Sequence, residues 1–583
     1  MFNRPWHKLP VLLALLRLIQ FRNQLRKKNL HDTAHLLHSG KLPKPVPDTS
    51  QSYLTTRTID GSFNDLKHPE MGMAGTRFGR NVPLQDSITD TTNIHSPNSR
   101  KVSQALLTRN NFIPATILNI NAASWIQFQT HDWFSHGRNQ PDSQWEVPIE
   151  GKDTWPQDQR PMKIDKTLAD QSRPAASDGP QTFINTETHW WDASQIYGSN
   201  QETIDKLRSH TDGKMRIEKS GFLPLDPELK IDLVAFPGTW WFGLSMLHTL
   251  FVKEHNSICD HLKQAYPQWD DEQLFNHARL INAALIAKIH TVEWTPAILP
   301  HPATAMAMNI NWWGILGRKF KNMFGRIGNS EILSGIPGSK AEHHAAPYSL
   351  TEEFVSVYRM HPLVPDQFDF YSHRDGKFLT SKPFMAGFDK QARPMMEDIG
   401  MENLFYSFGI AHPGALTLHN YPNFLRKLVK PTGEAFDLAA VDILRDRERG
   451  VPRYNRFREL VGRERVNSFE EITSNSQWAQ ELRVIYDNDI NQVDLMVGLY
   501  AEDLPEGFGF SDTAFRVFIL MASRRLKSDR FFTDDYRAEI YTQEGLNWIE
   551  NNSMLTVLRR HHPGLAPILA NVTNAFAPWP KRT

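Results

Sequence analysis

The stretch that most constrains this chain is residues 353–361, Glu-Phe-Val-Ser-Val-Tyr-Arg-Met-His. Its apolar residues and the absence of a breaker before Pro362 predict a helix. Residues three apart on a helix share one face, so Tyr358 and His361 are expected to lie together. A neutral imidazole can bind iron axially, and a phenol close to that iron could lose an electron to it. The alternative, commoner for such a pair taken alone, is a buried histidine beside a core tyrosine.

The composition excludes several classes of protein. Lys plus Arg and Asp plus Glu balance at 65 each, so no overall charge favours nucleic acid as a partner. Hydrophobic residues make up 40% and aromatic residues 11%, enough for a large buried core. Cys259 is the only cysteine, so no internal disulfide can form, which is consistent with a reducing compartment.

The first 30 residues carry Lys and Arg but no Asp or Glu, around an apolar run at 9–19. That run is too short to span a bilayer, and Arg17 interrupts it. A basic amphipathic helix is expected, which either docks on the protein's own core or lies on a membrane surface. No convincing signal-peptide cleavage site follows, so a cytoplasmic or peripheral membrane location is predicted.

The sequence Tyr358-Arg359-Met360-His361 resembles a motif of the fatty acid alpha-dioxygenases. These enzymes are a branch of the animal haem peroxidase and cyclooxygenase superfamily. The resemblance implies that His361 is the axial ligand of a haem b iron and that Tyr358 forms a tyrosyl radical. It also implies a mainly α fold with few short strands, as one large domain over residues 36–583 after a basic N-terminal segment, residues 1–35.

A second helix is expected over residues 119–133, where Gln127 and His131 are four apart and share a face. Taken alone, a histidine in such an aromatic helix is more often structural. By the resemblance, His131 lies over the open face of the haem and performs acid–base work on bound peroxide. Gln127 would donate a hydrogen bond to the ligand of the iron. Peroxidases of the superfamily carry an arginine eleven residues before the position of His248; the neighbourhood of Pro237 has no basic residue here, which argues against a general peroxidase.

Asp132 follows His131 directly and should point another way, toward the segment at 185–194. In an extended loop there, alternate residues would face one side. The resemblance implies a Ca²⁺ site, and Ca²⁺ takes oxygen ligands of mixed kinds. The ligands would be Asp132, Thr188, Trp190 through its carbonyl, Asp192 and Ser194. The alternative is an ordinary polar loop.

A third helix is expected over residues 277–297, and a fourth over 515–532. By the resemblance, His290 and Thr295 from the third helix hold the substrate carboxylate. Arg524 from the fourth helix completes this clamp, with Arg525 and Arg530 as alternatives. An arginine fork binds a carboxylate through two parallel hydrogen bonds.

Two further features follow from the resemblance. Asn420 is expected to hydrogen-bond to the proximal histidine, His361, as a second layer around the metal. The charged stretch at 437–455 is predicted to be a structural charge network rather than a nucleic-acid patch.

The function implied by the resemblance is haem-dependent fatty acid alpha-dioxygenation. A tyrosyl radical would abstract hydrogen from C2, and O₂ would add to give a 2-hydroperoxy acid that decays to CO₂ and an aldehyde one carbon shorter. Three alternatives stay open: a haem peroxidase oxidising phenols or halide, a cyclooxygenase-like enzyme that attacks mid-chain, and a haem-bearing membrane-surface protein without turnover.

Overall fold

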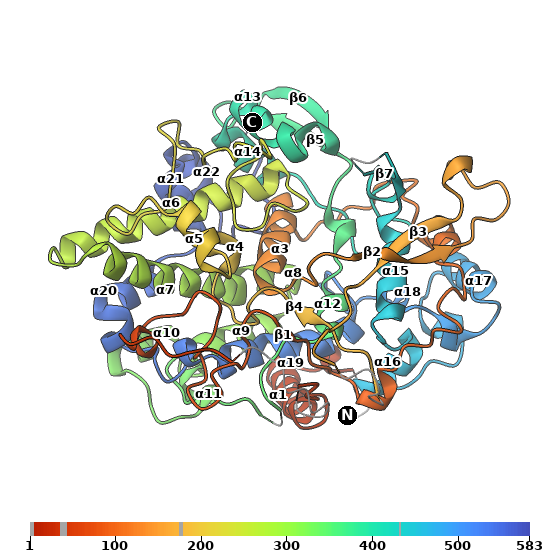
Figure 1. Cartoon of the computed structure of the whole chain (residues 1–583), viewed down its shortest axis with the longest axis horizontal. Coiled ribbons are helices and arrows are strands. Elements are labelled where there is room, and N and C mark those ends of the chain that lie inside the picture. The colour runs from red at the N-terminus through yellow and green to blue at the C-terminus, as the bar shows by residue number, and fades with distance from the viewer. Residues whose placement is uncertain (1–4, 35–43, 174–178, 345, 431–432, 583) are drawn as a thin grey trace.

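The computed structural model describes residues 5–34, 44–173, 179–344, 346–430 and 433–582, and its architecture is mainly α-helical (Figure 1). The N-terminal half contains α1 (Val11–Lys28), α2 (Ser99–Val102), α3 (Ile120–Trp133), α4 (Ser194–Tyr197), α5 (Gln201–Leu207), α6 (Phe242–Ala265), α7 (Asp271–Ile289) and α8 (Thr295–Ile298). The middle contains α9 (Pro302–Trp313), α10 (Gly317–Phe324), α11 (Glu331–Ser334), α12 (Glu352–Val357), α13 (Ala392–Ile399) and α14 (Met401–Ile410). The C-terminal part contains α15 (Leu438–Glu448), α16 (Tyr454–Leu460), α17 (Ser476–Ile485), α18 (Leu495–Ala501), α19 (Asp512–Ser528), α20 (Ala538–Asn551), α21 (Met554–His561) and α22 (Ala566–Leu569).

The strands are short and pair only two at a time within the described ranges. They form four antiparallel ladders: β1 (Thr76–Arg77) with β4 (Ile184–Asn185), β2 (Gln140–Val147) with β3 (Met162–Lys166), β5 (Gln367–Tyr371) with β6 (Phe378–Pro383), and β7 (Leu428–Val429) with β8 (Ala435–Phe436). Isolated two-stranded ladders are marginal in water and need packing against helices. The strands therefore pack on a helical core, and the fold is mainly α with few short strands, as predicted.

Side-chain caps begin the helices that later build the site. Asn119 accepts a hydrogen bond from the backbone N–H of Ala122 and so starts α3 where the sequence predicts a helix. Asp270 and Gln273 form a reciprocal capping box at the start of α7. Thr351 caps α12 and Ser511 caps α19.

The long helices α6 and α7 pack side by side at the left of Figure 1, and α15, α16 and α18 gather at the right. Helix α3 lies between these groups and contacts α6, and α12 contacts α19. One hydrophobic cluster runs from Trp6 to Trp579 through all these helices, so a single core supports the molecule. A small second cluster fills the space between the β2–β3 hairpin and α15.

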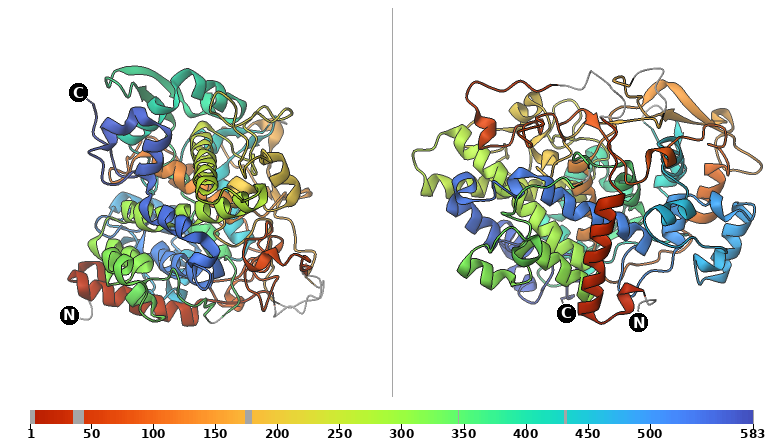
Figure 2. Two further views of the ribbon diagram at one scale, coloured as in Figure 1. Left: turned by 90° about the vertical axis from the view of Figure 1, so that its left-hand side faces the viewer. Right: turned by 90° about the horizontal axis from the view of Figure 1, so that it is seen from below.

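Helix α1 docks on the protein's own core (Figure 2, right). Its inner face contacts α9 and α19, and it also carries Arg22 and Arg26, which both pair with Glu331 at 2.7 Å. Burial opposes ionisation of Glu331, but the two arginine charges outweigh it and lower the pKa of Glu331 to about 2. Of the helices described, none has the length and apolar character to cross a membrane.

Candidate active site

A cavity of about 410 Å³ is lined by residues of α3, of the segment before α6 and of the chain that leaves α12. Most of its wall is apolar, and the few polar groups come from three segments. They are Gln127, Thr130 and His131 of α3, Thr239 before α6, and Tyr358 and His361 after α12. A large apolar cavity with few polar groups is the ordinary form of a ligand or cofactor site.

The helix predicted over 353–361 ends at Val357. A helix continued through Pro362 would bring the proline ring against the carbonyl of Tyr358, four residues earlier. The chain therefore turns at Tyr358, which has φ −92° and ψ 10°, and a 3₁₀ turn begins at His361. The prediction of one helical face was wrong, yet Tyr358 and His361 line the same cavity because the turn aims both side chains into it.

Asp442 of α15, and not Asn420, faces the imidazole of His361. Nδ1 of His361 lies 2.9 Å from Oδ2 of Asp442, an ion-pair distance without the alignment of a hydrogen bond. Burial opposes ionisation of Asp442, but His361 and Arg359 outweigh it and lower the pKa of Asp442 to about 2. Since the carboxylate engages Nδ1, the other ring nitrogen of His361 is left for a ligand in the cavity.

The expected role of Asn420 is corrected by its contacts. Its side-chain oxygen accepts hydrogen bonds from Nε of Arg109 and the backbone N–H of Ile113, and its amide nitrogen donates to the carbonyls of Ile113 and Ala415. These four bonds use the full capacity of the amide. Asn420 thus fixes the loop below His361 and does not reach the ring itself.

His131 and Gln127 face the cavity from α3. Burial lowers the pKa of His131 to about 4, so the imidazole is neutral near pH 7 and can accept a proton. The indole N–H of Trp241 donates to Oε1 of Gln127 at 2.8 Å. An indole can only donate, so this bond turns the amide nitrogen of Gln127 toward Thr239, 3.2 Å away.

The imidazole ring of His290 packs against three tryptophan rings. It stacks on Trp294 and meets Trp133 and Trp191 edge to face. The indole N–H of Trp125 lies 3.1 Å from Nδ1 of His290, so Nδ1 accepts. Burial and the charge of Arg525 hold the pKa of His290 well below its usual range, so the ring is neutral and carries its proton on Nε2.

The helix predicted over 277–297 is interrupted, because residues His290–Trp294 form a π-helical turn between α7 and α8. Such turns insert an extra residue into a helix and are frequent at functional sites. Thr295 follows this turn, and its hydroxyl donates to the carbonyl of His290 at 2.9 Å. His290 and Thr295 are thus held together, but the hydroxyl must rotate before it can donate to an anion.

Arg525, and not Arg524, points toward His290 and Tyr358. Its guanidinium lies 4.2 Å from the ring centre of Trp133 and 4.5 Å from that of Trp191. It is 2% exposed, and its Nε and Nη2 have no hydrogen-bond partner in the described part of the chain. A buried cation with two unused N–H groups can receive a carboxylate.

The guanidinium groups of Arg524 and Arg530 already have hydrogen-bond or ion-pair partners within the protein. Arg524 donates to the backbone carbonyls of His343, Ser349, Ala346 and Pro347. Arg530 pairs with Asp535 and donates to carbonyls between residues 53 and 64. The contacts of Arg524 leave it unsuited to the predicted role, whereas Arg525, one of the two alternatives, keeps N–H groups without a partner among the described residues.

The oxygen groups expected to bind Ca²⁺ converge, although the segment at 185–194 bends instead of running extended. Oδ1 of Asp132 accepts hydrogen bonds from the backbone N–H of Ser194 at 2.5 Å and from its hydroxyl at 3.0 Å. The hydroxyl of Thr188 donates to Asp192 at 2.9 Å. Trp190 turns its indole away, donating to the carbonyl of Gly61.

The burial and pKa shifts of the carboxylates in this cluster indicate whether a cation fits between them. Oδ2 of Asp132 is buried with no partner among described atoms. Burial, and then the nearby charge of Asp192, raise the pKa of Asp132 well above its usual range. A divalent cation between the carboxylates would remove this penalty. Arg279, 3.6 Å from Asp192, supplies part of the countercharge already, and in the described ranges no group of three or more His, Cys, Asp or Glu side chains is arranged to hold a metal ion.

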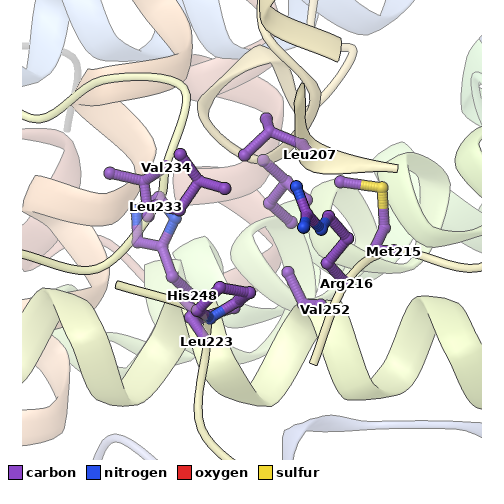
Figure 3. Close-up of a pocket in the computed structure, with 10 residues that line it drawn as sticks. Leu207, Met215, Arg216, Leu223, Leu233, Val234, His248 and Val252 are labelled. Atoms are coloured by element: carbon purple, nitrogen blue, oxygen red, sulfur yellow. The ribbon is translucent and has the colours of Figure 1, made fainter. Parts of the chain in front are cut away.

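A smaller cavity, of about 10 Å³, is lined by His248 of α6 (Figure 3). Leu223, Leu233, Val234 and Val252 surround it, and Phe128 and Trp240 meet the His248 ring edge to face. A space of this size holds a water molecule at most. His248 is thus a packed core residue.

Asp442 and Trp125 are functional candidates that sequence reasoning missed. A sequence clue existed for Asp442, because Asp442 and Asp446 lie four apart in the charged stretch and so share one face of its helix. Arg359 bridges these two carboxylates from the motif that carries His361. The charge network of 437–455 is therefore structural, as predicted, and also orients the motif.

The fold and cavity define a helical peroxidase-like protein, and comparison with known proteins supports this. Residues 56–573 match the family model described as animal haem peroxidase. Alpha-dioxygenase 1 of Arabidopsis thaliana is 39% identical over 592 aligned positions, covering 99% of this chain and 90% of the relative. Alpha-dioxygenase PIOX of Oryza sativa is 38% identical, covering 98% and 93%.

Solved structures agree with the sequence relatives. The crystal structure of fatty acid alpha-dioxygenase from Arabidopsis thaliana matches with a TM-score of 0.90 at 37% identity, over 99% of this chain and 90% of that one. That of Oryza sativa matches with 0.89 at 37% identity, over 98% and 94%. A Tyr-to-Phe variant of the latter has been solved with palmitic acid, with the same TM-score and coverage. The chain belongs to the animal haem peroxidase family and, within it, to the alpha-dioxygenases, which are oxidoreductases.

Proposed function

We propose that this protein is a haem-dependent fatty acid alpha-dioxygenase that converts a fatty acid and O₂ into a 2-hydroperoxy acid. The observation that carries the proposal is the position of Tyr358. It lines the cavity that holds His361 and His131, and its ring also contacts Trp133, which packs on Arg525 and His290.

The cavity walls suit a haem. His361 would hold the haem iron through its other ring nitrogen while Asp442 faces Nδ1, and His131 and Gln127 line the same cavity. Family membership implies the haem, and the apolar lining suits a porphyrin face. When bound, haem supplies the one-electron oxidation that Tyr358 needs.

Tyr358 performs the hydrogen transfers. Burial raises the pKa of its phenol, so the group keeps its proton until it is oxidised. The phenoxyl radical takes a hydrogen atom from C2 of the fatty acid and becomes a phenol again. O₂ adds to the carbon radical, and the resulting peroxyl radical takes the hydrogen atom back from Tyr358. The product is a 2-hydroperoxy acid, and the Tyr358 radical is restored.

Arg525 and His290 would set the position of attack. A carboxylate held by the guanidinium of Arg525 and by Nε2–H of His290 leaves C2 as the first carbon available to Tyr358. Orientation, rather than bond strength, then selects the C–H bond. A cyclooxygenase-like attack in mid-chain would need the anchor farther from Tyr358.

The test is oxygen uptake by haem-loaded protein given a saturated fatty acid, with mass analysis of the product. A saturated chain has no weak allylic C–H bond, so oxygenation at C2 requires an anchored carboxylate. A 2-hydroperoxide, or an aldehyde one carbon shorter with CO₂ and water, is expected. Tyr358→Phe should abolish uptake while haem is retained; uptake at the wild-type rate in this variant would refute the role of Tyr358. Rapid oxidation of a phenolic dye without oxygen uptake would favour a peroxidase instead.

We also propose Ca²⁺ at the group formed by Asp132, Thr188, Asp192, Ser194 and the carbonyl of Trp190. The unpartnered Oδ2 of Asp132 supports this. Bound there, Ca²⁺ would link the end of α3 to the segment before α4 and so restrict the motion of His131 and Gln127 on α3. Chelation should lower the melting temperature, and added Ca²⁺ should restore it. A melting temperature that is unchanged by a chelator would contradict the site.

A peripheral membrane contact is proposed for the outer side of α1, within the segment 1–35. Leu12 and Leu16 are 66% and 62% exposed, and Met323 of α10 is 74% exposed. Helices α1 and α10 both pack on α9. Apolar side chains beside Lys and Arg suit an anionic lipid surface, where fatty acids gather.

Sedimentation with vesicles of phosphatidylcholine, with and without phosphatidylserine, tests the contact. The protein should pellet with the anionic vesicles, and the double variant Leu12→Ser, Leu16→Ser should stay in the supernatant. Val484→Ser, on an exposed position of α17, is the matched control and should behave like wild type. Wild-type protein that ignores both vesicles would refute the contact.

A further inference from the structure

Thr239 occupies an unusual backbone position at the edge of the main cavity. It lies between Gly238 and Trp240, lines the cavity, and has φ +54°, in the left-handed region. A β-branched residue rarely adopts this conformation, which costs on the order of 1–3 kcal/mol. Such strain persists where the surroundings require it, and it is often found at functional sites.

The hydroxyl of Thr239 lies between the side chains of His131 and Gln127. Its oxygen lies 3.3 Å from Nε2 of His131 and 3.2 Å from the amide nitrogen of Gln127. Trp241 fixes the amide of Gln127 by donating to its oxygen, so the amide nitrogen must donate to Thr239. A line of contacts therefore runs from Trp241 through Gln127 and Thr239 to His131.

A hydroxyl is suited to this junction because it both accepts and donates. It accepts from Gln127, and it can serve Nε2 of His131 in either tautomer of the neutral ring. No basic residue lies between Phe236 and Phe242, so the flank of the cavity is neutral here.

We propose that Thr239 is a positioning residue, whose hydroxyl fixes the orientation of the His131 and Gln127 side chains where they face the cavity. This inference deepens the proposed function and rests on its haem. The left-handed backbone conformation of Thr239 places its hydroxyl between the side chains of His131 and Gln127. Without the hydroxyl, the imidazole of His131 keeps only packing contacts, such as the ring of Phe236 at 4.7 Å, and Nδ1 has no partner among the described residues.

The experiment uses haem-loaded protein and two small ligands of the iron, cyanide and carbon monoxide, with three variants. Thr239→Val removes the hydroxyl and keeps the β-branched shape and its strain. Thr239→Ser keeps the hydroxyl. Thr239→Gly removes the hydroxyl and relieves the backbone. Cyanide affinity and the C–O stretching band of the reduced carbon monoxide complex are measured, with melting temperature and haem content for each variant.

Thr239→Val and Thr239→Gly should bind cyanide about fivefold to tenfold more weakly, the effect of one lost hydrogen bond. Both should also broaden or split the C–O band. Thr239→Ser should stay within about twofold of wild type. Thr239→Gly should keep or raise the melting temperature while losing cyanide affinity, a combination that a purely structural role does not produce.

Wild-type cyanide affinity and a wild-type C–O band in Thr239→Val would overturn the inference, as would a Thr239→Ser variant as impaired as the valine. These measurements need no fatty acid turnover, so they are independent of the substrate. Wild-type protein that shows no Soret band with added haem would overturn the proposed function itself, and this inference with it.

Discussion

Replacing Arg525 with glutamine gives the most direct test of the substrate clamp. The guanidinium is buried against Trp133 and Trp191, and its Nε and Nη2 have no hydrogen-bond partner in the described structure. Each charge-assisted hydrogen bond to a carboxylate contributes about 1.5–3 kcal/mol. Two such bonds, at about 1.4 kcal/mol per factor of ten, predict a fall in kcat/KM of about 10²–10⁴ for Arg525→Gln.

The assay compares oxygen uptake with palmitic acid and with its primary amide. The wild-type enzyme should prefer the acid strongly, because the amide carries no charge for Arg525. In Arg525→Gln the preference should collapse, since the acid loses its partner and the amide does not. The Soret band and melting temperature confirm that each variant has folded and bound haem.

Arg524→Gln is the matched control on the adjacent residue. It removes hydrogen bonds to four backbone carbonyls, so it should lower the melting temperature and destabilise the fold by about 2–4 kcal/mol. Below its melting range, kcat/KM for palmitic acid should stay within about threefold of wild type. If Arg525→Gln kept its preference for the acid while Arg524→Gln lost it, the assignment of the clamp would be reversed.

Two further substitutions test the surroundings of the site. Asp442→Asn weakens the hold on His361, so haem should transfer to apomyoglobin at least about tenfold faster than from wild type; an equal transfer rate would contradict a role for this carboxylate. Glu331 has a folded pKa of about 2 against an ordinary value of 4.5, so its pairs with Arg22 and Arg26 stabilise the protein above pH 4.5. That stability, about 3 kcal/mol, is lost as pH falls from about 5 toward 2. Unfolding free energies across this range should fall less steeply for Glu331→Gln, and an unchanged slope would refute the pairing.

Much of the site could be predicted from local sequence. The Tyr358–His361 motif and its order after the helix of His131 carry the resemblance to the alpha-dioxygenases, and that resemblance implied the class of fold and the choice of cavity residues. Local chemistry explains this success. Asn119 caps α3 through its own side chain, whatever the rest of the chain does. Pro362, by contrast, ends at Val357 the helix that was predicted to run through His361.

The errors concern choices that local sequence leaves open. Arg524 and Arg525 are adjacent on α19, so they point about 100° apart around the helix. Only the packing of α19 against α12 determines which guanidinium faces Tyr358 and which faces backbone carbonyls. The partner of His361 was missed for the same reason, because Asp442 lies 81 residues away in sequence and reaches the ring through the placement of α15.

The sequence by itself determined the types of chemical group at and near the cavity: two imidazoles, a phenol and an arginine. It did so because these groups sit in short motifs whose residues are joined covalently. Only the tertiary structure decided which arginine, which carboxylate and which hydroxyl serve them. Those partners come from separate helices and loops, and their directions depend on how the helices pack.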